Sequence, residues 1–405
     1  MKCILFISDA VRPDYLGCYG NPDINTTAVD ELAAGGVRFD VAISAAPWTA
    51  PSMTSIISGI YAHRHQIFTW EREVTDTMHT LFHAFADHDH VIGSFVFDQN
   101  FLFSHMPFAS VQGNTDRFDR VCDWVRQHAD QDFFLLIHSW ATHMPYNVHH
   151  AARKEWKAAK EIFIRRLQTD GEEGVRQSQA AYRQAIEYTS AHQITPLIDL
   201  LEKRRIKDET LFIFTSDHGE SWGERFENKM DVKGIHHLHG RFLYDETLKV
   251  PLILHWPERL PDRRVVRSQV RTVDLAPTLF DLVDFQLPAP SAQSMDGASL
   301  LPLIEGTEAR DRPAFSATSE HGRLSKVSLR DAGHKYIYSE GESKGELYDL
   351  GQDPGERTNL VDQLPALAHE MRTKIETELA GVTPAEMTPE EEAILLDRLT
   401  QLGYL

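Results

Sequence analysis

Five short apolar runs constrain the fold of this chain more than any other feature. They are rich in Ile, Val, Leu and Phe, and they span residues 3–8, 91–97, 133–139, 210–217 and 250–256. Runs of this length without polar alternation are typical of strands buried on both faces of a mostly parallel sheet. Helical patterns separate them and cover residues 26–35, 74–86, 115–129 and 176–204. The alternation predicts an α/β fold whose central, mostly parallel sheet is flanked by helices.

The composition of the sequence changes in two places. Residues 150–185 are strongly charged and polar, which predicts an exposed helical excursion. Residues 315–350 contain short apolar stretches broken by turn residues, which is typical of a small antiparallel sheet. We therefore predict a catalytic α/β domain over residues 1–310 and a C-terminal subdomain over residues 311–405 with a small sheet and a helical tail.

The helical tail predicts an interaction surface. Its apolar residues fall on or near one helical face; they are Ile394, Leu395, Leu396, Leu399 and Leu402. An apolar stripe on a helix needs a partner to cover it. We expect the tail to dock on its own C-terminal subdomain or on a neighbouring subunit, so homo-oligomer formation through the tail is a prediction.

Charge and cysteine content limit the partners and the compartment. The net charge of −19 argues against nucleic acid or an anionic membrane as the main partner. The N-terminal apolar run is too short for a signal peptide or a membrane span. The three cysteines, Cys3, Cys18 and Cys122, form no CxxC motif and cannot pair evenly, which favours reduced thiols and a cytoplasmic setting.

Polar side chains end several of the predicted strands. The first strand ends in Ser8-Asp9, the third in His138 with His143 close behind, and the fourth in Asp217-His218. A single Asp after a strand is more often a helix cap or a turn residue than a ligand. Ligands of open α/β sheets bind outside the carboxyl ends of the strands, where these residues converge. Together they predict a site for a divalent metal ion.

Several sequence blocks resemble the sulfatase-type branch of the alkaline phosphatase superfamily. They include "SDAVRPDYLGCYG", "PWTAPSMTSIISGIYAHRH", "HSWATHMPY", "SDHGESWGE" and "ELYDLGQDPGERTNL". The blocks occur in the order of that family and run from Ile4 to about Leu360. The resemblance implies a central sheet flanked by helices, with a smaller C-terminal sheet and helix.

The resemblance also implies a metal site. Asp9 matches the first of two adjacent metal-binding Asp residues of sulfatases, and Ala10 replaces the second. Asp217 and His218 match the Asp-His metal pair. With Thr49, they form the implied ligand set. Imidazole suits Zn²⁺ and Mn²⁺ better than Ca²⁺, so we favour the first two metals and leave Ca²⁺ and the number of ions open.

Three further residues of this sequence match functional positions of the family. His143 falls where the family places a His that contacts the substrate or a second metal, and His239 matches a similar His of phosphoethanolamine transferases. Arg241 falls where sulfatases carry an active-site Lys, although a surface arginine is an equal alternative. The spacing Asp-x-x-Arg-x-Asp, here Asp9 to Asp14, is more like phosphonate monoester hydrolases and related phosphodiesterases.

The nucleophile position departs from the sulfatase pattern. Sulfatases carry a Cys there that is oxidised to formylglycine, and this sequence has Thr49. Threonine cannot be converted to formylglycine, so we expect no formylglycine. Its hydroxyl can attack phosphorus when a metal lowers its pKa and a helix N-terminus stabilises the charge. The alternative is that Thr49 only caps the helix that begins there.

These inferences predict a metal-dependent hydrolase of small anionic esters. The favoured substrates are phosphomonoesters, phosphodiesters or phosphonate monoesters, cleaved through a covalent Thr49 intermediate with His143 or His239 as proton donor. Two alternatives stay open, a sulfatase that acts on sulfate esters and a phosphoryl or phosphoethanolamine-type transferase. Such transferases carry membrane helices, and none is apparent in this sequence. The sequence does not indicate the leaving group.

The metal site makes a geometric prediction. Asp9, Asp217 and His218 should converge with Thr49 on one divalent ion, at bond lengths of about 2.0–2.6 Å. A structure determination checks this directly. A separation of more than about 8 Å between Asp9 and His218 would contradict the site, since one ion could not bridge the two residues.

Overall fold

A computed structural model describes most of the chain around a nine-stranded sheet. The described residues are 1–69, 72, 74, 78–96, 110–113, 115, 117–146, 153–223, 238–285, 295–320, 322–341 and 344–382. The strand order is β4-β3-β5-β1-β6-β7-β2-β8, and β9 also pairs with β2. The strands are β1 (Lys2–Ser8), β2 (Val37–Ile43), β3 (Val91–Phe95), β4 (Ser110–Gly113), β5 (Phe133–Ser139), β6 (Thr210–Thr215), β7 (Lys249–His255), β8 (Arg264–Val266) and β9 (Val270–Arg271).

The centre of the sheet is parallel and its other half is mixed. Strands β4, β3, β5, β1 and β6 run parallel to one another, whereas β7 runs antiparallel to both β6 and β2. The prediction that all five apolar runs are strands is confirmed, but the last of them, β7, is not parallel to its neighbours. We missed β2 because Arg38 and Asp40 interrupt its apolar pattern, which a partly exposed strand tolerates.

Helices cover both faces of this sheet, which confirms the predicted fold class. Alternate residues of β1 face opposite sides: Leu5 packs in one buried cluster and Phe6 in the other. One cluster includes residues of α2 (Thr49–Ser58), α4 (Leu81–Asp87), α10 (Leu275–Leu282) and α11 (Leu301–Glu305). The other includes residues of α1 (Thr27–Ala34), α5 (Phe118–His128), α7 (Gly171–Thr189) and α8 (Thr195–Arg204).

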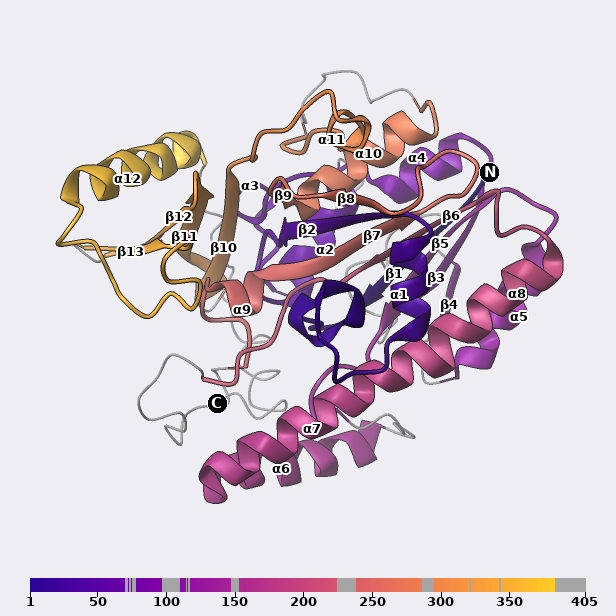
Figure 1. Cartoon of the computed structure of the whole chain (residues 1–405), viewed down its shortest axis with the longest axis horizontal. Helices are drawn as coiled ribbons and strands as arrows, with labels where there is room; N and C mark the ends of the chain where they lie inside the picture. Colours follow the sequence, from indigo (N-terminus) through magenta and orange to yellow (C-terminus); the bar gives the residue numbers. More distant parts are fainter. Residues whose placement is uncertain are drawn as a thin grey trace.

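The predicted helical excursion is a pair of helices. Helix α6 (Arg153–Thr169) packs against α7, and both project from the sheet in Figure 1. A π-helical turn (Ser190–Ile194) joins α7 to α8, so the predicted helix over 176–204 is continuous in helical structure. The short helices are η1 (Pro13–Tyr15), η2 (Gly17–Tyr19), α3 (Ala62–His65), α9 (Asp245–Leu248) and η5 (Thr272–Asp274).

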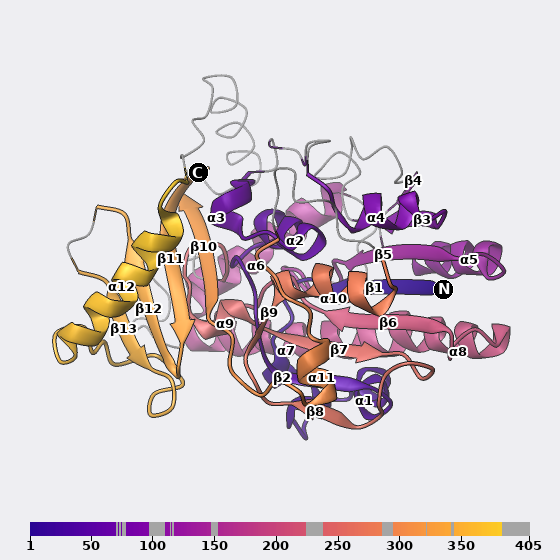
Figure 2. The same cartoon turned by 90° about the horizontal axis from the view of Figure 1, so that it is seen from above.

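A second, antiparallel sheet lies at one end of the molecule, as predicted (Figures 1 and 2). Its strands are β10 (Ala314–Glu320), β11 (Arg323–Asp331), β12 (His334–Ser339) and β13 (Glu346–Asp349), and α12 (Pro365–Leu379) packs on β11 and β12. This sheet packs against the large one, because Ile43 of β2 shares a buried cluster with Ala314 of β10 and Ile337 of β12. The division into domains at residue 310 stays a prediction.

Three further expectations concern the chain as a whole. The apolar tail from Ile394 to Leu402 lies outside the described residues, so its docking stays a prediction. Within the described ranges, no helix has both the length and the apolar character that a membrane span requires. Cys3, Cys18 and Cys122 are free thiols.

A buried ion cluster joins the second sheet to the segment that enters β7. The Nζ atom of Lys335 on β12 lies 2.5 Å from Asp245 Oδ1 and 2.9 Å from Glu356 Oε1. Lys335 is fully buried and also donates to the carbonyl of Leu243. Removing one member of such a cluster leaves buried charges without compensation, so the cluster holds the sheet in place.

We predict that Lys335→Met lowers the free energy of unfolding by about 3 kcal/mol, because Asp245 and Glu356 would lose the buried cation that they share, while Arg330, 3.2 Å from Asp245, compensates part of the remaining charge. Urea unfolding measures the change. Lys344→Met is the matched control, since Lys344 pairs with Asp362 at a surface where both side chains are mostly exposed. The control should change stability by no more than about 1 kcal/mol. Equal losses in the two variants would contradict a structural role for the buried cluster.

Candidate active site

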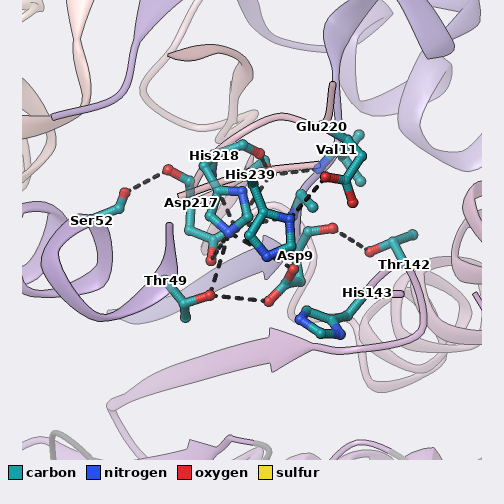
Figure 3. Close-up of polar contacts among 12 residues, drawn as sticks. Asp9, Val11, Thr49, Ser52, Thr142, His143, Asp217, His218, Glu220 and His239 are labelled. Carbon is teal, nitrogen blue, oxygen red and sulfur yellow. Dashed lines mark hydrogen bonds and ion pairs between the residues drawn. The ribbon is translucent and has the colours of Figure 1, made fainter. Parts of the chain in front are cut away.

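The parallel pairing of β5, β1 and β6 brings the predicted strand-end residues to one edge of the sheet. Ser8 at the end of β1 pairs with Ser139 of β5, and Ile7 pairs with Thr215 of β6. Asp9 and Asp217 therefore leave neighbouring strands at the same level. Figure 3 shows their side chains turned toward Thr49, which begins the adjacent helix α2.

Asp9, Asp217 and His218 form a compact group that we call the metal triad. Their nearest donor atoms all lie within 4.8 Å of one another, and all three residues are fully buried. The Nε2 atom of His218 is 3.5 Å from Asp217 Oδ2 and 4.0 Å from Asp9 Oδ1. This convergence meets the geometric condition set by the sequence, and the ligand roles themselves stay a prediction.

The triad fits a divalent cation. Asp9 Oδ1 and Asp217 Oδ2 are buried and make no hydrogen bond, which is costly for carboxylate oxygens unless a cation compensates them. The Nδ1 atom of His218 donates to the carbonyl of Gly219 at 2.8 Å, so the lone pair of the neutral ring lies on Nε2, which faces the carboxylates. The donor set of carboxylate oxygens and imidazole suits Zn²⁺ or Mn²⁺, and the identity of the metal stays a prediction.

Backbone contacts hold the two carboxylates in place. The Asp9 N–H donates to the carbonyl of Ser139, and the Asp9 carbonyl accepts from Thr142 Oγ1 at 2.6 Å. Asp217 Oδ1 accepts from the N–H groups of Ala10 and His218 at 3.1 and 3.0 Å. Ala10 has a φ of 57°, a left-handed conformation that is strained for a residue with a side chain. This strain lies directly beside the metal triad.

Thr49 is aimed at the triad and does not cap its helix. Its Oγ1 atom lies 3.4 Å from both Asp9 Oδ2 and His218 Nε2 (Figure 3). The N-cap residue of α2 is Trp48, and it makes no side-chain capping bond. These contacts do not support the alternative that Thr49 only caps the helix. They place its hydroxyl where a nucleophile would have to lie.

Two serines connect helix α2, which begins at Thr49, to the metal triad by hydrogen bonds. Ser52, one turn after Thr49, donates its Oγ proton to the carbonyl of Asp217 at 2.5 Å. Ser44 donates to the same carbonyl at 2.6 Å, and the two hydroxyls lie 2.9 Å apart. These contacts fix the start of α2 relative to Asp217-His218, which sets the distance from Thr49 to the triad.

His143 and His239 lie beside the triad, as Figure 3 shows, but in different environments. His143 Nδ1 donates to the carbonyl of Met144, and burial lowers the pKa of His143 to about 4. His239 Nδ1 lies 2.8 Å from Glu220 Oε1. Burial opposes the charged form of His239, but the Glu220 carboxylate raises its pKa above the ordinary value. The two rings are 5.6 Å apart and suit different roles.

His138, the strand-end residue of β5, also reaches the triad. Its Nε2 atom lies 3.2 Å from Asp9 Oδ2 and 3.5 Å from Asp217 Oδ2. Burial disfavours its charged form, yet the Asp217 and Asp9 carboxylates raise the pKa of His138 to about 9. Burial likewise opposes ionisation of Asp217, but His218 and His138 hold the pKa of Asp217 well below its usual range. Attraction between the imidazoles and the carboxylates dominates this edge of the sheet.

Arg241 is placed away from this group of contacts. Its side chain is 55% exposed, and its guanidinium lies 3.8 Å from Glu320, which is also exposed. This is the surface placement that we had kept as the alternative. A substrate contact from Arg241 stays a prediction.

From the sequence we missed Glu220, which contacts His239, and Tyr146, which contacts Glu220. Glu220 is fully buried, and its second carboxylate oxygen accepts from Tyr146 Oη at 2.6 Å. Both residues lie within the motifs quoted for the family resemblance, but only their spatial neighbours reveal what they do. One signal was available: a glutamate two residues after His218, close to the predicted Asp-His metal pair.

Comparison with known proteins identifies the family. The family model described as "Sulfatase" matches residues 2–285, and a model described as "N-sulphoglucosamine sulphohydrolase, C-terminal" matches residues 234–383. The chain belongs to the sulfatase family. Members of this family, in the alkaline phosphatase-like superfamily, are metal-dependent ester hydrolases, and this sulfatase-family protein is an ester hydrolase.

Sequence relatives of this family member carry sulfatase names. It is 26% identical over 404 residues to the ulvan-active sulfatase of Formosa agariphila, covering 88% of this chain and 75% of that protein. It is 32% identical over 192 residues to the choline-sulfatase of Rhizobium meliloti, but this match covers 47% of the chain and 34% of that protein. The second match spans about a third of the relative.

Solved structures of the family share the fold. The phosphonate monoester hydrolase of Agrobacterium radiobacter superposes with a TM-score of 0.76 at 19% identity, covering 96% of this chain and 98% of that one. A 2-O glycosaminoglycan sulfatase superposes with a TM-score of 0.74 at 20% identity, covering 96% of each chain. These similarities confirm the α/β sulfatase fold.

We predict that Glu220→Gln lowers kcat by about tenfold to a hundredfold, because proton transfer by a positioned side chain contributes about 10²–10⁴-fold and His239 would lose its charged partner. KM should change much less. Steady-state kinetics on an alkyl ester, whose leaving oxygen needs a proton, measures both constants. Glu246→Gln is the matched control, since Glu246 accepts from Ser221 Oγ nearby. Equal kcat values for Glu220→Gln and the native enzyme would exclude a positioning role for Glu220.

Proposed function

We propose that this protein hydrolyses phosphate or phosphonate esters through a covalent intermediate on Thr49. The observation that carries the proposal is a threonine hydroxyl, 3.4 Å from Asp9 and from His218, at the position where sulfatases use formylglycine. A formylglycine diol can expel sulfate by collapsing to its aldehyde. A threonine ester has no such route and must be cleaved by water or transferred to an acceptor, which favours phosphorus over sulfur.

Asp9, Asp217, His218 and Thr49 are the residues that would hold the metal ion. When bound, the ion lowers the pKa of the Thr49 hydroxyl and offsets charge on the non-bridging oxygens of the ester. The N-terminus of α2 adds a positive dipole at the same point. The ester oxygens therefore bind where positive charge is concentrated.

The proposed reaction has two chemical steps, formation and hydrolysis of the Thr49 ester, and each step uses particular side chains. In the first step, Thr49 Oγ1, which has already lost its proton to solvent and leaves again as the alkoxide in the second step, forms a bond to phosphorus while the bond from phosphorus to the leaving oxygen breaks. His239 donates a proton from Nε2 to that oxygen, and Glu220 stabilises the imidazolium form that carries the proton. In the second step, water attacks phosphorus, the bond to Thr49 Oγ1 breaks, and His239 recovers a proton from the water.

His143 suits a different part in this scheme. A neutral imidazole whose Nδ1 proton is given to the carbonyl of Met144 presents Nε2 as an acceptor. Stacking on Trp140, at 4.1 Å between ring centroids and 8° between planes, holds the ring in this orientation. We propose that His143 orients a hydroxyl of the substrate or the attacking water, whereas His239 supplies the proton.

Sulfate esters are the second candidate class. The observation that favours them is the set of sulfatase names among the sequence relatives, including the ulvan-active sulfatase. A panel with one leaving group, 4-nitrophenol, separates the candidates: phosphomonoester, phosphodiester, phosphonate monoester and sulfate ester. A phosphorus ester should have the highest kcat/KM. A sulfate ester with the highest kcat/KM would replace the proposal by the second candidate.

We predict that Thr49→Ala lowers kcat by about a thousandfold or more, because a missing nucleophile cripples the reaction even when binding persists. Thr49→Ser should retain part of the activity, since it keeps a hydroxyl and loses only the methyl group that restricts the rotamer. Acid quench during turnover of a ³²P-labelled ester should leave label on the Thr49 peptide. An Ala variant that is less stable but nearly as fast would show that Thr49 has only a structural role.

A further inference from the structure

His138 is a buried imidazole without a hydrogen-bond partner for the nitrogen that faces the metal triad. The side chain is 5% exposed, and its Nε2 atom makes no hydrogen bond of acceptable geometry. What sets His138 apart among the buried histidines is that this nitrogen faces two buried carboxylates, those of Asp9 and Asp217. Held beside these carboxylates, the imidazole can pair with them as a cation or, when neutral, give its Nε2 lone pair to an ion bound between them.

The atoms around His138 Nε2 are the ones that would bind the ion. Asp9 Oδ2 and Asp217 Oδ2 lie 3.2 and 3.5 Å from it, and Asp217 Oδ2 has no hydrogen bond of its own. Donor atoms around one ion with bonds of about 2.0–2.2 Å are separated by about 3–3.6 Å along each edge. The two distances from His138 therefore match the edges of a coordination polyhedron.

We propose that His138 is a further nitrogen ligand of the ion held by the metal triad. The neighbouring position that could supply another carboxylate, Ala10, carries no donor atom in its side chain. His138 lies outside the set of donors that are all within 4.8 Å of one another, so joining one ion with that set requires small shifts of these side chains. The inference rests on the metal dependence in the proposed function and concerns a residue which that function does not use.

A second imidazole changes which metal the site prefers. Two carboxylates, two imidazoles and a hydroxyl form a mixed oxygen and nitrogen set, which favours Zn²⁺ and Mn²⁺ over the oxygen-preferring Ca²⁺ and Mg²⁺. Without His138, the triad and Thr49 would offer three oxygen donors and one nitrogen. His138 therefore acts in metal selection as well as in metal affinity.

The test counts the imidazoles bound to Mn²⁺ in the full-length protein by pulsed electron paramagnetic resonance of coordinated ¹⁴N. The native protein should show two imidazoles, and His138→Ala should show one. Competition titrations should show weaker binding of Zn²⁺ and Mn²⁺ by at least about tenfold in His138→Ala, with a smaller change for Ca²⁺. His255→Gln is the matched control, since His255 is a similarly buried strand histidine on β7, paired with Phe212 near the start of β6.

The outcomes separate the possible failures. Two imidazoles retained in His138→Ala, or one in the native protein, would overturn the ligand role of His138 and leave the proposed function standing. His138→Gln that binds Zn²⁺ and Mn²⁺ as tightly as the native protein would also overturn it, because Gln keeps a hydrogen-bond donor at that position. No divalent ion bound to the native protein would overturn the metal triad itself. Melting temperatures without metal show whether each variant is folded.

Discussion

Two fully buried carboxylates on neighbouring strands are the constraint on which the rest of this site depends. Asp9 and Asp217 leave β1 and β6 at the same level, and each keeps one oxygen that no protein donor satisfies. Two like charges about 4 Å apart repel by several kcal/mol even at an intermediate effective dielectric constant. The surroundings offset this repulsion with imidazoles, backbone N–H groups and a helix N-terminus. The same arrangement creates a strong site for a cation.

The smaller sheet is part of this active site rather than an appendage. Thr318 on β10 donates to the carbonyl of Gly240, next to His239, and the N–H of Gly240 donates to the carbonyl of Pro47. Ser316 donates to the carbonyl of Ser44, which also contacts Asp217. The second sheet thus holds the loop with His239 against the turn that presents Thr49.

The threonine at the nucleophile position limits which ester chemistry the site can carry out. The hydroxyl lies at the start of a fully buried helix, between a carboxylate and an imidazole, with two serines fixing the helix behind it. A hydroxyl so placed can form an ester, but it lacks the internal route by which a diol releases its product. In the proposed mechanism, the second step therefore depends on water and on His239, whose pKa, despite burial, the Glu220 carboxylate raises.

The sequence by itself determined the fold class and named all three residues of the metal triad. Apolar runs mark buried strands because burial on both faces excludes polar residues, and the polar residues that end them mark the carboxyl edge of the sheet. Only the tertiary structure decided which partner each side chain has. Glu220 is two residues from His218 in sequence, yet its function follows from contacts with His239 and Tyr146, 19 and 74 residues away. Strand β2, the exposure of Arg241 and the approach of His138 to both carboxylates were decided in the same way, because contacts between distant segments leave no local pattern in the sequence.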